Sequence, residues 1–161
     1  MNRRVVIVFC LVFALVLTVQ GFSQQTRLTF KSVSYVSDTL KPLVIDKDHF
    51  MEVGEQMGIQ TSDNPAFNMT VDYLVVVSID NGVVHFHGYG VSVDKDGDTM
   101  LSEFWDNPAG GGKAKVTGGT GKFEGVEGTC DYVSEFPKGW PEGTGRLISH
   151  NTWNLILKKP L

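Results

Sequence analysis

Residues 118–128 carry the sequence GGTGKFEGVEG, in which five of the eleven positions are glycine. A phosphate-binding glycine loop follows a strand and opens a helix. No helical period follows this stretch, and residues 129–134 alternate like a strand instead. We therefore interpret the glycines as backbone devices, which supply positive φ at a tight turn and allow close strand approach at a bulge. This interpretation predicts a β-barrel or sandwich and disfavours a phosphate loop.

The N-terminus predicts export. Arg3 and Arg4 precede an apolar run over residues 5–19, and small residues follow it, which is the pattern of a secretory signal peptide. The run is shorter than the roughly 20 residues that a membrane span needs. We expect residues 1–23 to be removed, which leaves residues 24–161 as one β-barrel domain that is secreted or periplasmic and has no membrane contact. A retained N-terminal anchor is the alternative.

Charge and cysteine content restrict the partners. Loss of two N-terminal arginines leaves 12 of the 14 basic residues against 18 acidic ones, so the net charge becomes −6. Without a Lys/Arg cluster, nucleic acid is a poor partner. Cys130 would be the single remaining cysteine, so no internal disulfide forms and stability must come from the core. The thiol is either a buried small hydrophobe or a reactive group.

Period-2 alternation and turn residues predict an all-β chain with no long amphipathic helix. Residues 50–60 are ambiguous between a strand and a short helix. Residues 38–48 and 136–145 carry proline and charges and are expected to be irregular. The strands are expected at residues 28–36, 69–79, 83–93, 99–106, 129–134 and 146–157.

Two turns set the predicted register. If Asn81-Gly82 and Asp96-Gly97 are both two-residue loops, Val77 faces Phe86 and His87 faces Asp106. The face that pairs large side chains with glycine suits a tightly curved inner wall, and we take it as the interior. It carries Tyr73, Val75, Val77, Phe86, Gly88, Gly90, Glu103 and Trp105. The outer face carries Leu74, Val76, Ser78, His85, His87, Tyr89, Ser102, Phe104 and Asp106.

Glu103 is the candidate catalytic residue. Burial between Tyr73 and Trp105 would raise its pKa and suit it to acid–base chemistry or to anchoring a polar ligand head. The alternative is a carboxylate near a rim that reaches water or an arginine. The candidate ligand-binding residues are Tyr73, Val75, Val77, Phe86 and Trp105.

Two patterns raise the question of a metal. His85 and His87 share a strand face with Asp106, but two or three such groups on neighbouring strands fall short of a site unless another ligand converges. The run of residues 94–98, DKDGD, has its glycine in the fourth position and lacks flanking helices, so we interpret it as a charged hairpin turn and not as an EF-hand loop. We expect no metal and no cofactor.

Residues 115–125, followed by Gly128-Thr129, resemble the signature of the allene oxide cyclase and dirigent barrel group. Residues 91–98 are also similar to small exported bacterial members of that group. The resemblance implies an eight-stranded antiparallel barrel, calycin-like in shape and often trimeric. Plant members bind or steer apolar substrates inside the barrel. The catalytic acids of those proteins have no counterpart recognisable in this chain.

The expected function is therefore an exported β-barrel that holds a small apolar or amphipathic molecule in its interior. A cyclase or isomerase in which Glu103 stabilises charge is the second hypothesis. A structural or interaction barrel filled by its own side chains is the third. A homotrimer would cover the outward apolar side chains Leu74, Val76, Tyr89 and Phe104.

Overall fold

The computed structural model describes residues 25–39, 41–107, 111–135, 146–159 and 161, in which nine strands and two short 3-10 helices occur. The predicted signal peptide at 1–23 and the predicted loop at 136–145 lie outside the described residues. The elements are β1 (Thr26–Asp38), β2 (Lys41–Val44), β3 (His49–Ser62), η1 (Pro65–Phe67), β4 (Met69–Asp80), β5 (Val83–Asp94), β6 (Thr99–Asp106), β7 (Gly112–Gly119), η2 (Gly121–Phe123), β8 (Glu127–Glu135) and β9 (Arg146–Leu157).

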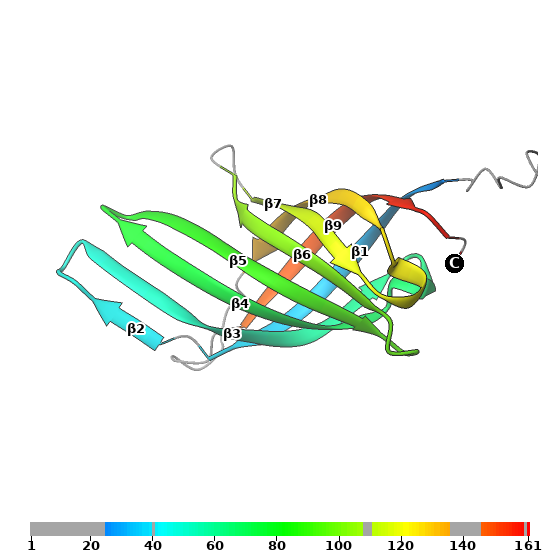
Figure 1. Cartoon of the computed structure of the whole chain (residues 1–161). Coiled ribbons are helices and arrows are strands. Elements are labelled where there is room, and N and C mark those ends of the chain that lie inside the picture. Colours follow the sequence, from blue (N-terminus) through cyan, green and yellow to red (C-terminus); the bar gives the residue numbers. More distant parts are fainter. Residues whose placement is uncertain (1–24, 40, 108–110, 136–145, 160) are drawn as a thin grey trace, which may run out of the picture.

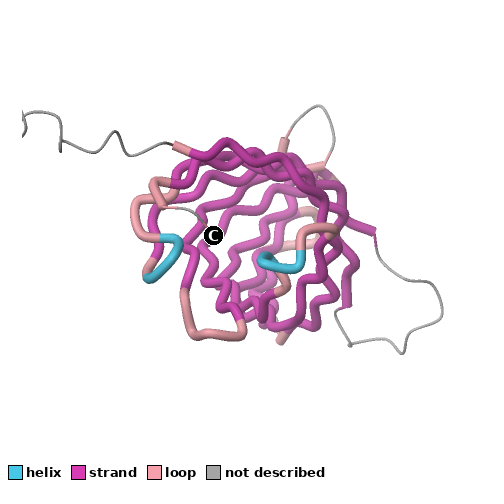
Figure 2. The backbone as a smooth tube through the Cα atoms, turned by 90° about the vertical axis from the view of Figure 1, so that its right-hand side faces the viewer, coloured by secondary structure: helices cyan, strands magenta, loops and turns pink. Residues whose placement is uncertain are grey.

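The strands close into a barrel. Their order is β1-β9-β8-β7-β6-β5-β4-β3-β2, and β3 also pairs with β1, so eight strands form an antiparallel ring and β2 lies outside it on β3. The closing pair joins Ser32–Asp38 to Gln56–Ser62. Figure 1 shows the strands from the side and Figure 2 shows the ring from one end. The predicted closed eight-stranded antiparallel barrel is confirmed.

The glycine-rich stretch is structural. Val116 pairs with Ser102 while Gly118 pairs with Leu101, so Thr117 is the extra residue of a β-bulge. The chain then turns through η2, where Gly121 has φ of 57°. An interpretation of this run as bulge and turn, instead of a phosphate loop, is therefore correct.

The two predicted hairpins differ in outcome. Asn81 and Gly82 both have positive φ, and Asp80 pairs with Val83, so the first turn is the predicted two-residue loop. Around Gly97, however, Val93 pairs with Thr99, which leaves a longer loop than the prediction assumed. The register of β6 against β5 is consequently shifted by one residue.

The longer loop has a local cause. Asp94 Oδ1 accepts hydrogen bonds from the backbone N–H groups of Asp96 and Asp98, both at 2.9 Å. Gly97 adopts a φ of 85°. It therefore supplies the residue in the left-handed region that a three-residue hairpin loop requires. Because side chains alternate along a strand, a shift of one residue exchanges the inner and outer faces of β6. Ser102 and Phe104 therefore face inward, and Glu103 and Trp105 face outward.

The region before the first hairpin also differs from the prediction. Residues 50–60 belong to a long strand, β3, which settles the ambiguity in favour of a strand. The stretch 38–48, expected to be irregular, contains β2, which pairs with residues 50–53 of β3. In Figure 1 the hairpins β2–β3 and β4–β5 extend beyond the ends of the other strands. A four-stranded extension thus stands at one end of the barrel.

Among the described residues, no helix has the length and apolar character that crossing a membrane requires.

Candidate functional site

One end of the barrel is closed by packed apolar side chains. The two 3-10 helices and the C-terminus lie at this end, which faces the viewer in Figure 2. Phe67 of η1 and Phe123 of η2 are fully buried, and their rings lie 5.7 Å apart. Phe67 also stacks on Phe30 with ring centroids 4.0 Å apart. Met100, Leu155 and Leu157 complete this plug. Toward the opposite end of the barrel the described inward side chains are partly exposed, and we call that end the open end.

Neutral polar side chains of β1, β3 and β9 form a group on the inner wall between the plug and the open end, and we call this group the belt. Asn151 Nδ2 donates to Ser34 Oγ at 3.0 Å and to Ser32 Oγ at 3.1 Å. Asn151 Oδ1 accepts from the Ser149 hydroxyl at 2.8 Å. Gln60 Nε2 donates to the carbonyl oxygen of Phe67 at 3.1 Å. All five polar residues of this paragraph are buried, so the inner wall is not apolar throughout.

The ionisable groups beside this belt are held neutral. Burial raises the pKa of Tyr73 well above its usual value, with the nearby Cys130 acting in the same direction and a Ser34 hydrogen bond opposing it. Burial likewise raises the pKa of Tyr132. Cys130 is buried, and this burial raises its pKa to about 12, which favours the buried-hydrophobe reading over a reactive thiol.

The inner wall toward the open end is lined by half-buried side chains. Val77, Phe86, Tyr132 and Leu147 lie on the inward side of their strands, yet solvent reaches each of them. The rings of Phe86 and Tyr132 lie 6.2 Å apart, although they come from β5 and β8. Apolar surface that faces the axis and remains accessible is the lining that a small ligand would bury.

Four of the predicted ligand-binding residues lie on the inner face. Val75 is buried, and Tyr73, Val77 and Phe86 are half-buried on the same side of β4 and β5. The glycines opposite them serve the predicted close packing: a Cβ on Gly90 would lie 2.2 Å from the Tyr73 ring. The Tyr73 ring meets Phe104 edge-on with centroids 5.4 Å apart.

The predicted interior positions of Glu103 and Trp105 are wrong. Trp105 pairs with the exposed His87, and Glu103 pairs with the exposed Tyr89. The cause is the longer loop around Gly97, which shifts β6 by one residue. Phe104, expected outside, takes the inward place.

Glu103 belongs to an outer polar cluster. His87 Nε2 donates to Glu103 Oε1 at 2.9 Å, and the Tyr89 hydroxyl donates to the same oxygen at 3.3 Å. The hydrogen bond from His87 lowers the pKa of Glu103 and outweighs the smaller opposing effect of burial. The predicted rise in pKa is therefore wrong, because the carboxylate has solvent and partners instead of an apolar wall.

The histidine pair divides between two carboxylates. His85 Nδ1 lies 3.1 Å from Asp106 Oδ2, whereas His87 bonds Glu103, so the predicted His87–Asp106 pairing is wrong. The other Asp106 oxygen accepts from the backbone N–H of Phe86 at 3.3 Å, just beyond the last β5–β6 pair. No group of three or more His, Cys, Asp or Glu residues in the described part of the chain is arranged to hold a metal ion.

The acidic hairpin at residues 94–98 already holds a cation, which is an ammonium group. Lys122 Nζ forms an ion pair with Asp94 Oδ2 and lies 3.6 Å from Asp96 Oδ2. Asp98 Oδ2 accepts from the Lys122 backbone N–H at 3.1 Å. Burial acts to raise the pKa of Asp94, but Lys122 and two backbone N–H groups outweigh it and lower the pKa. The hairpin therefore clamps η2 against the closed end.

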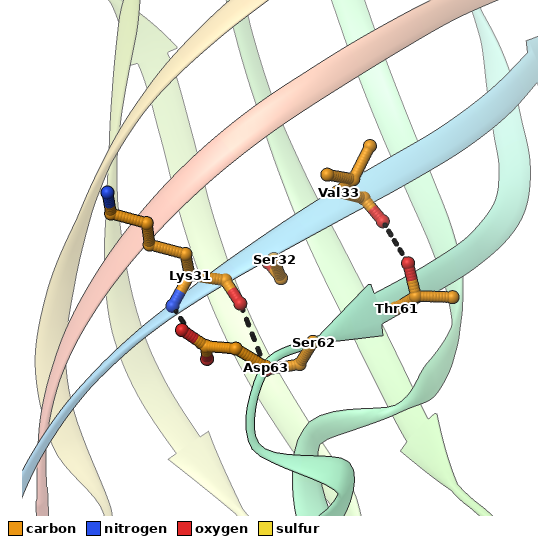
Figure 3. A pocket seen from close by; sticks show the side chains of 6 residues that line it. All are labelled: Lys31, Ser32, Val33, Thr61, Ser62 and Asp63. Carbon is orange, nitrogen blue, oxygen red and sulfur yellow. Dashed lines mark hydrogen bonds between the residues drawn. The ribbon is translucent and has the colours of Figure 1, made fainter.

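A hollow of about 260 Å³ lies on the wall where β1 and β3 part, and its lining includes Ser32 of the belt (Figure 3). Its polar groups largely satisfy one another: the Lys31 N–H donates to Asp63 Oδ1 and the Asp63 N–H donates to the Lys31 carbonyl oxygen, both at 3.0 Å. The Thr61 hydroxyl is turned to the Val33 carbonyl oxygen. This internal pairing favours the barrel interior over the hollow as the functional site.

Sequence reasoning missed the polar belt. The signal was present as serine, glutamine or asparagine at alternate positions of otherwise apolar inner faces, as in Phe30, Ser32, Ser34 and Val36. Asn151 and Ser149 repeat that pattern on β9. Only closure of the ring shows that the two series meet, since Ser32 and Asn151 are separated by most of the chain.

Comparisons with known proteins concern the fold alone. No protein-family model matches the chain, and no curated protein matches it. Among solved structures it is similar to the pterocarpan synthase dirigent protein GePTS1, with a TM-score of 0.51 and 12% sequence identity over 86% of this chain and 87% of that one. The barrel of this chain is thus dirigent-like in fold.

Proposed function

We propose that this protein is exported to the periplasm or the cell exterior and binds a small apolar or amphipathic molecule inside the barrel. The observation that supports this proposal most is the layered inner wall. An apolar plug closes one end, a polar belt follows, and accessible aromatic and aliphatic side chains line the approach. Such a mostly apolar concave wall with a few placed polar groups is typical of small-molecule sites.

The binding hypothesis ranks above the enzymatic one because of where the carboxylates lie. Glu103 faces outward, and the described inward-facing carboxylates lie at the open rim or, as Asp94, at the closed end. A cyclase or isomerase would therefore have to use neutral groups such as Tyr73 at mid-depth. We keep that alternative, which a loss of turnover without loss of binding in Tyr73→Phe would support.

A bulky residue at Val75 is expected to weaken ligand binding strongly. Val75 is buried on the inner face of β4, whereas its neighbour Val76 is 39% exposed on the outer face. Val75→Trp should weaken binding of the fluorescent probe N-phenyl-1-naphthylamine by at least about tenfold, since the indole would occupy the probe's space. Val76→Trp makes the same change outside and should bind the probe like the parent protein.

Fluorescence titration of the three proteins, each checked for folding by circular dichroism, measures the difference. Equal affinity of the Val75→Trp and Val76→Trp variants would show that the probe binds outside the lumen. No binding to the parent protein would favour a barrel filled by its own side chains.

We also propose that the protein forms a homo-oligomer, a trimer by its resemblance to the cyclase and dirigent group. The outer face of four adjacent strands carries a patch of exposed apolar side chains, in which Leu74 is paired with Tyr89 and Val91 with Leu101. Met57 and Ile59 of β3 belong to this patch, although their partners on β4 are Asp72 and Thr70. Exposed apolar patches mark interaction sites.

Leu74→Glu is expected to convert the oligomer to a monomer. Leu74 is 61% exposed at the centre of the patch, and a carboxylate there would have to be desolvated in the interface. Val133→Glu, at a side chain of 63% exposure on β8, is the matched control and should leave the assembly intact. Size-exclusion chromatography with light scattering measures both masses. A monomeric parent protein would contradict the proposal.

A further inference from the structure

From the charge pattern of the inner wall we propose that the site takes an uncharged amphipathic ligand with a hydroxyl or carbonyl group and excludes carboxylates. The inference rests on the proposed function, because it concerns the same lumen. It follows from three features of the described residues: the neutrality of the belt, a spare hydrogen-bond donor within it, and acidic residues at the entrance.

The belt is made of hydroxyl and amide groups from three strands. Ser32, Ser34, Gln60 and Asn151 are all less than a tenth exposed and bond one another. Between the rim and the closed end, strand alternation places none of the described lysines, arginines or histidines on the inner face. A carboxylate moved to this depth would lose its hydration without gaining a counter-charge, which is strongly unfavourable.

Ser32 offers a specific contact to a neutral ligand. Its hydroxyl oxygen accepts from Asn151 Nδ2 and from Trp153 Nε1, both at 3.1 Å. These two bonds use both lone pairs and leave the hydroxyl hydrogen, for which the described part of the chain shows no donated hydrogen bond. A ligand carbonyl, ether or hydroxyl oxygen would satisfy that donor at no charge cost.

The entrance adds electrostatic selection. Asp38, Glu52 and Asp106 lie on the inward side of β1, β3 and β6 where these strands approach the open end, and each is half-buried. Burial raises the pKa of Asp38. His85 lies against Asp106, and Arg146 lies at the same end on the outward side of β9, paired with Ser37. The described inward-facing residues of the rim nevertheless carry carboxylates and no cation. The rim field therefore opposes the entry of anions.

The same interior opposes ionisation of its own groups, since burial raises the pKa values of Tyr73, Tyr132 and Cys130. An acidic ligand would meet the same environment. Neutral alcohols, ketones, esters and amides with an apolar body form the ligand class that fits.

The test uses two matched pairs of probes on the purified protein at pH 7.5. N-phenyl-1-naphthylamine and 1-anilinonaphthalene-8-sulfonate share their rings and differ by a sulfonate. Decanol and decanoate share their chain length and differ in charge, and they are compared as competitors of the bound neutral dye. We expect the neutral member of each pair to bind at least about tenfold more tightly.

Two variants locate the cause. The double variant Asp38→Asn, Glu52→Gln should reduce the difference in affinity between decanol and decanoate, because decanoate should bind more tightly to it. Asn151→Leu should weaken decanol binding by about tenfold, because it removes the donor and acceptor that order the belt. Ser149→Ala is the milder second variant, with an effect in the same direction, if Asn151→Leu does not fold.

The outcomes separate the two proposals. Tight and equal binding of decanol and decanoate would overturn charge selection while leaving ligand binding intact. Absence of binding by every probe would overturn the proposed function and this inference together. A preference for the neutral members that is unchanged by both the rim variant and the belt variants would also overturn the inference, because the selection would then arise elsewhere.

Discussion

Gly58→Ala is expected to lower the free energy of unfolding by about 3 kcal/mol or more, the upper range for overpacking a tight site. Gly58 lies in β3 where this strand pairs with both β1 and β4. A Cβ there would lie 2.0 Å from the carbonyl oxygen of Tyr35 and 2.9 Å from the Cα of Val36. Both are backbone atoms of the strand that closes the barrel, so no side-chain rotation can relieve the clash.

Thermal unfolding followed by circular dichroism measures this effect, and we expect the melting temperature to fall by about 10 °C. Gly118→Ala is the matched control in another strand, since its Cβ would meet only Leu101 Cδ1 at 3.7 Å. That variant should be neutral or slightly more stable, because alanine reduces the entropy of the unfolded chain. Equal melting temperatures for the two variants would contradict the role assigned to Gly58 in closure.

Lys122→Met should lower the free energy of unfolding by about 3 kcal/mol, which is the low end of the range for removing one partner of a buried ion pair. The Asp94 side chain is 2% exposed, and its Oδ2 accepts no hydrogen bond of good geometry among the described residues, so the Lys122 ammonium group is the charge that compensates it. Lys95→Met is the control. Lys95 is 83% exposed and contacts Asp96 in the same hairpin, so its loss should cost less than about 1 kcal/mol.

Asp94→Asn in the Lys122→Met background should recover most of the loss, because the amide keeps an oxygen for the Asp96 and Asp98 N–H groups and carries no charge. Urea unfolding of the parent protein, Lys122→Met, Asp94→Asn and the double variant completes the cycle. If the double variant were no more stable than Lys122→Met, the loss of stability would come from the packing of the lysine side chain and not from the ion pair.

The pH dependence has a definite sign. Asp94 has a lowered pKa in the folded protein. Its contribution to the free energy of unfolding is therefore fully present above the pKa of the unfolded chain, about 3.9, and is lost as the pH falls through the folded pKa. The difference in unfolding free energy between the parent protein and Lys122→Met should therefore shrink as the solution is acidified below about pH 4. A difference that stays constant as the pH falls below about 4 and through the folded pKa of Asp94 would exclude the ion pair as its source.

The two hairpins show how far turn chemistry can be predicted. At Asn81-Gly82 both turn residues adopt positive φ, so two adjacent residues determine the loop and with it the β4–β5 register. At Asp96-Gly97 the loop length depends on Asp94, whose side chain bonds two backbone N–H groups further along. The dipeptide alone does not contain that information, and an error of one residue placed Glu103 and Trp105 on the wrong face.

The candidate site was predictable only in part. The inner positions of Tyr73, Val75, Val77 and Phe86 follow from alternation and the first turn. The polar belt does not, because it joins β1 to β9 and to β3 through ring closure. A serine at an alternate position could equally face solvent at a strand end.

By itself the sequence determined most of the strands, the first hairpin and the bulge and turn at the glycine run, because each depends on alternation or turn residues within a few positions. It did not predict β2, and the closed eight-stranded barrel was implied by the family resemblance. Tertiary structure decided that Asn151 meets Ser32 and Ser34, and that Lys122 neutralises Asp94. These are contacts between residues distant in the chain. They exist only when the closed ring fixes the mutual register of its strands, a condition that no local pattern encodes.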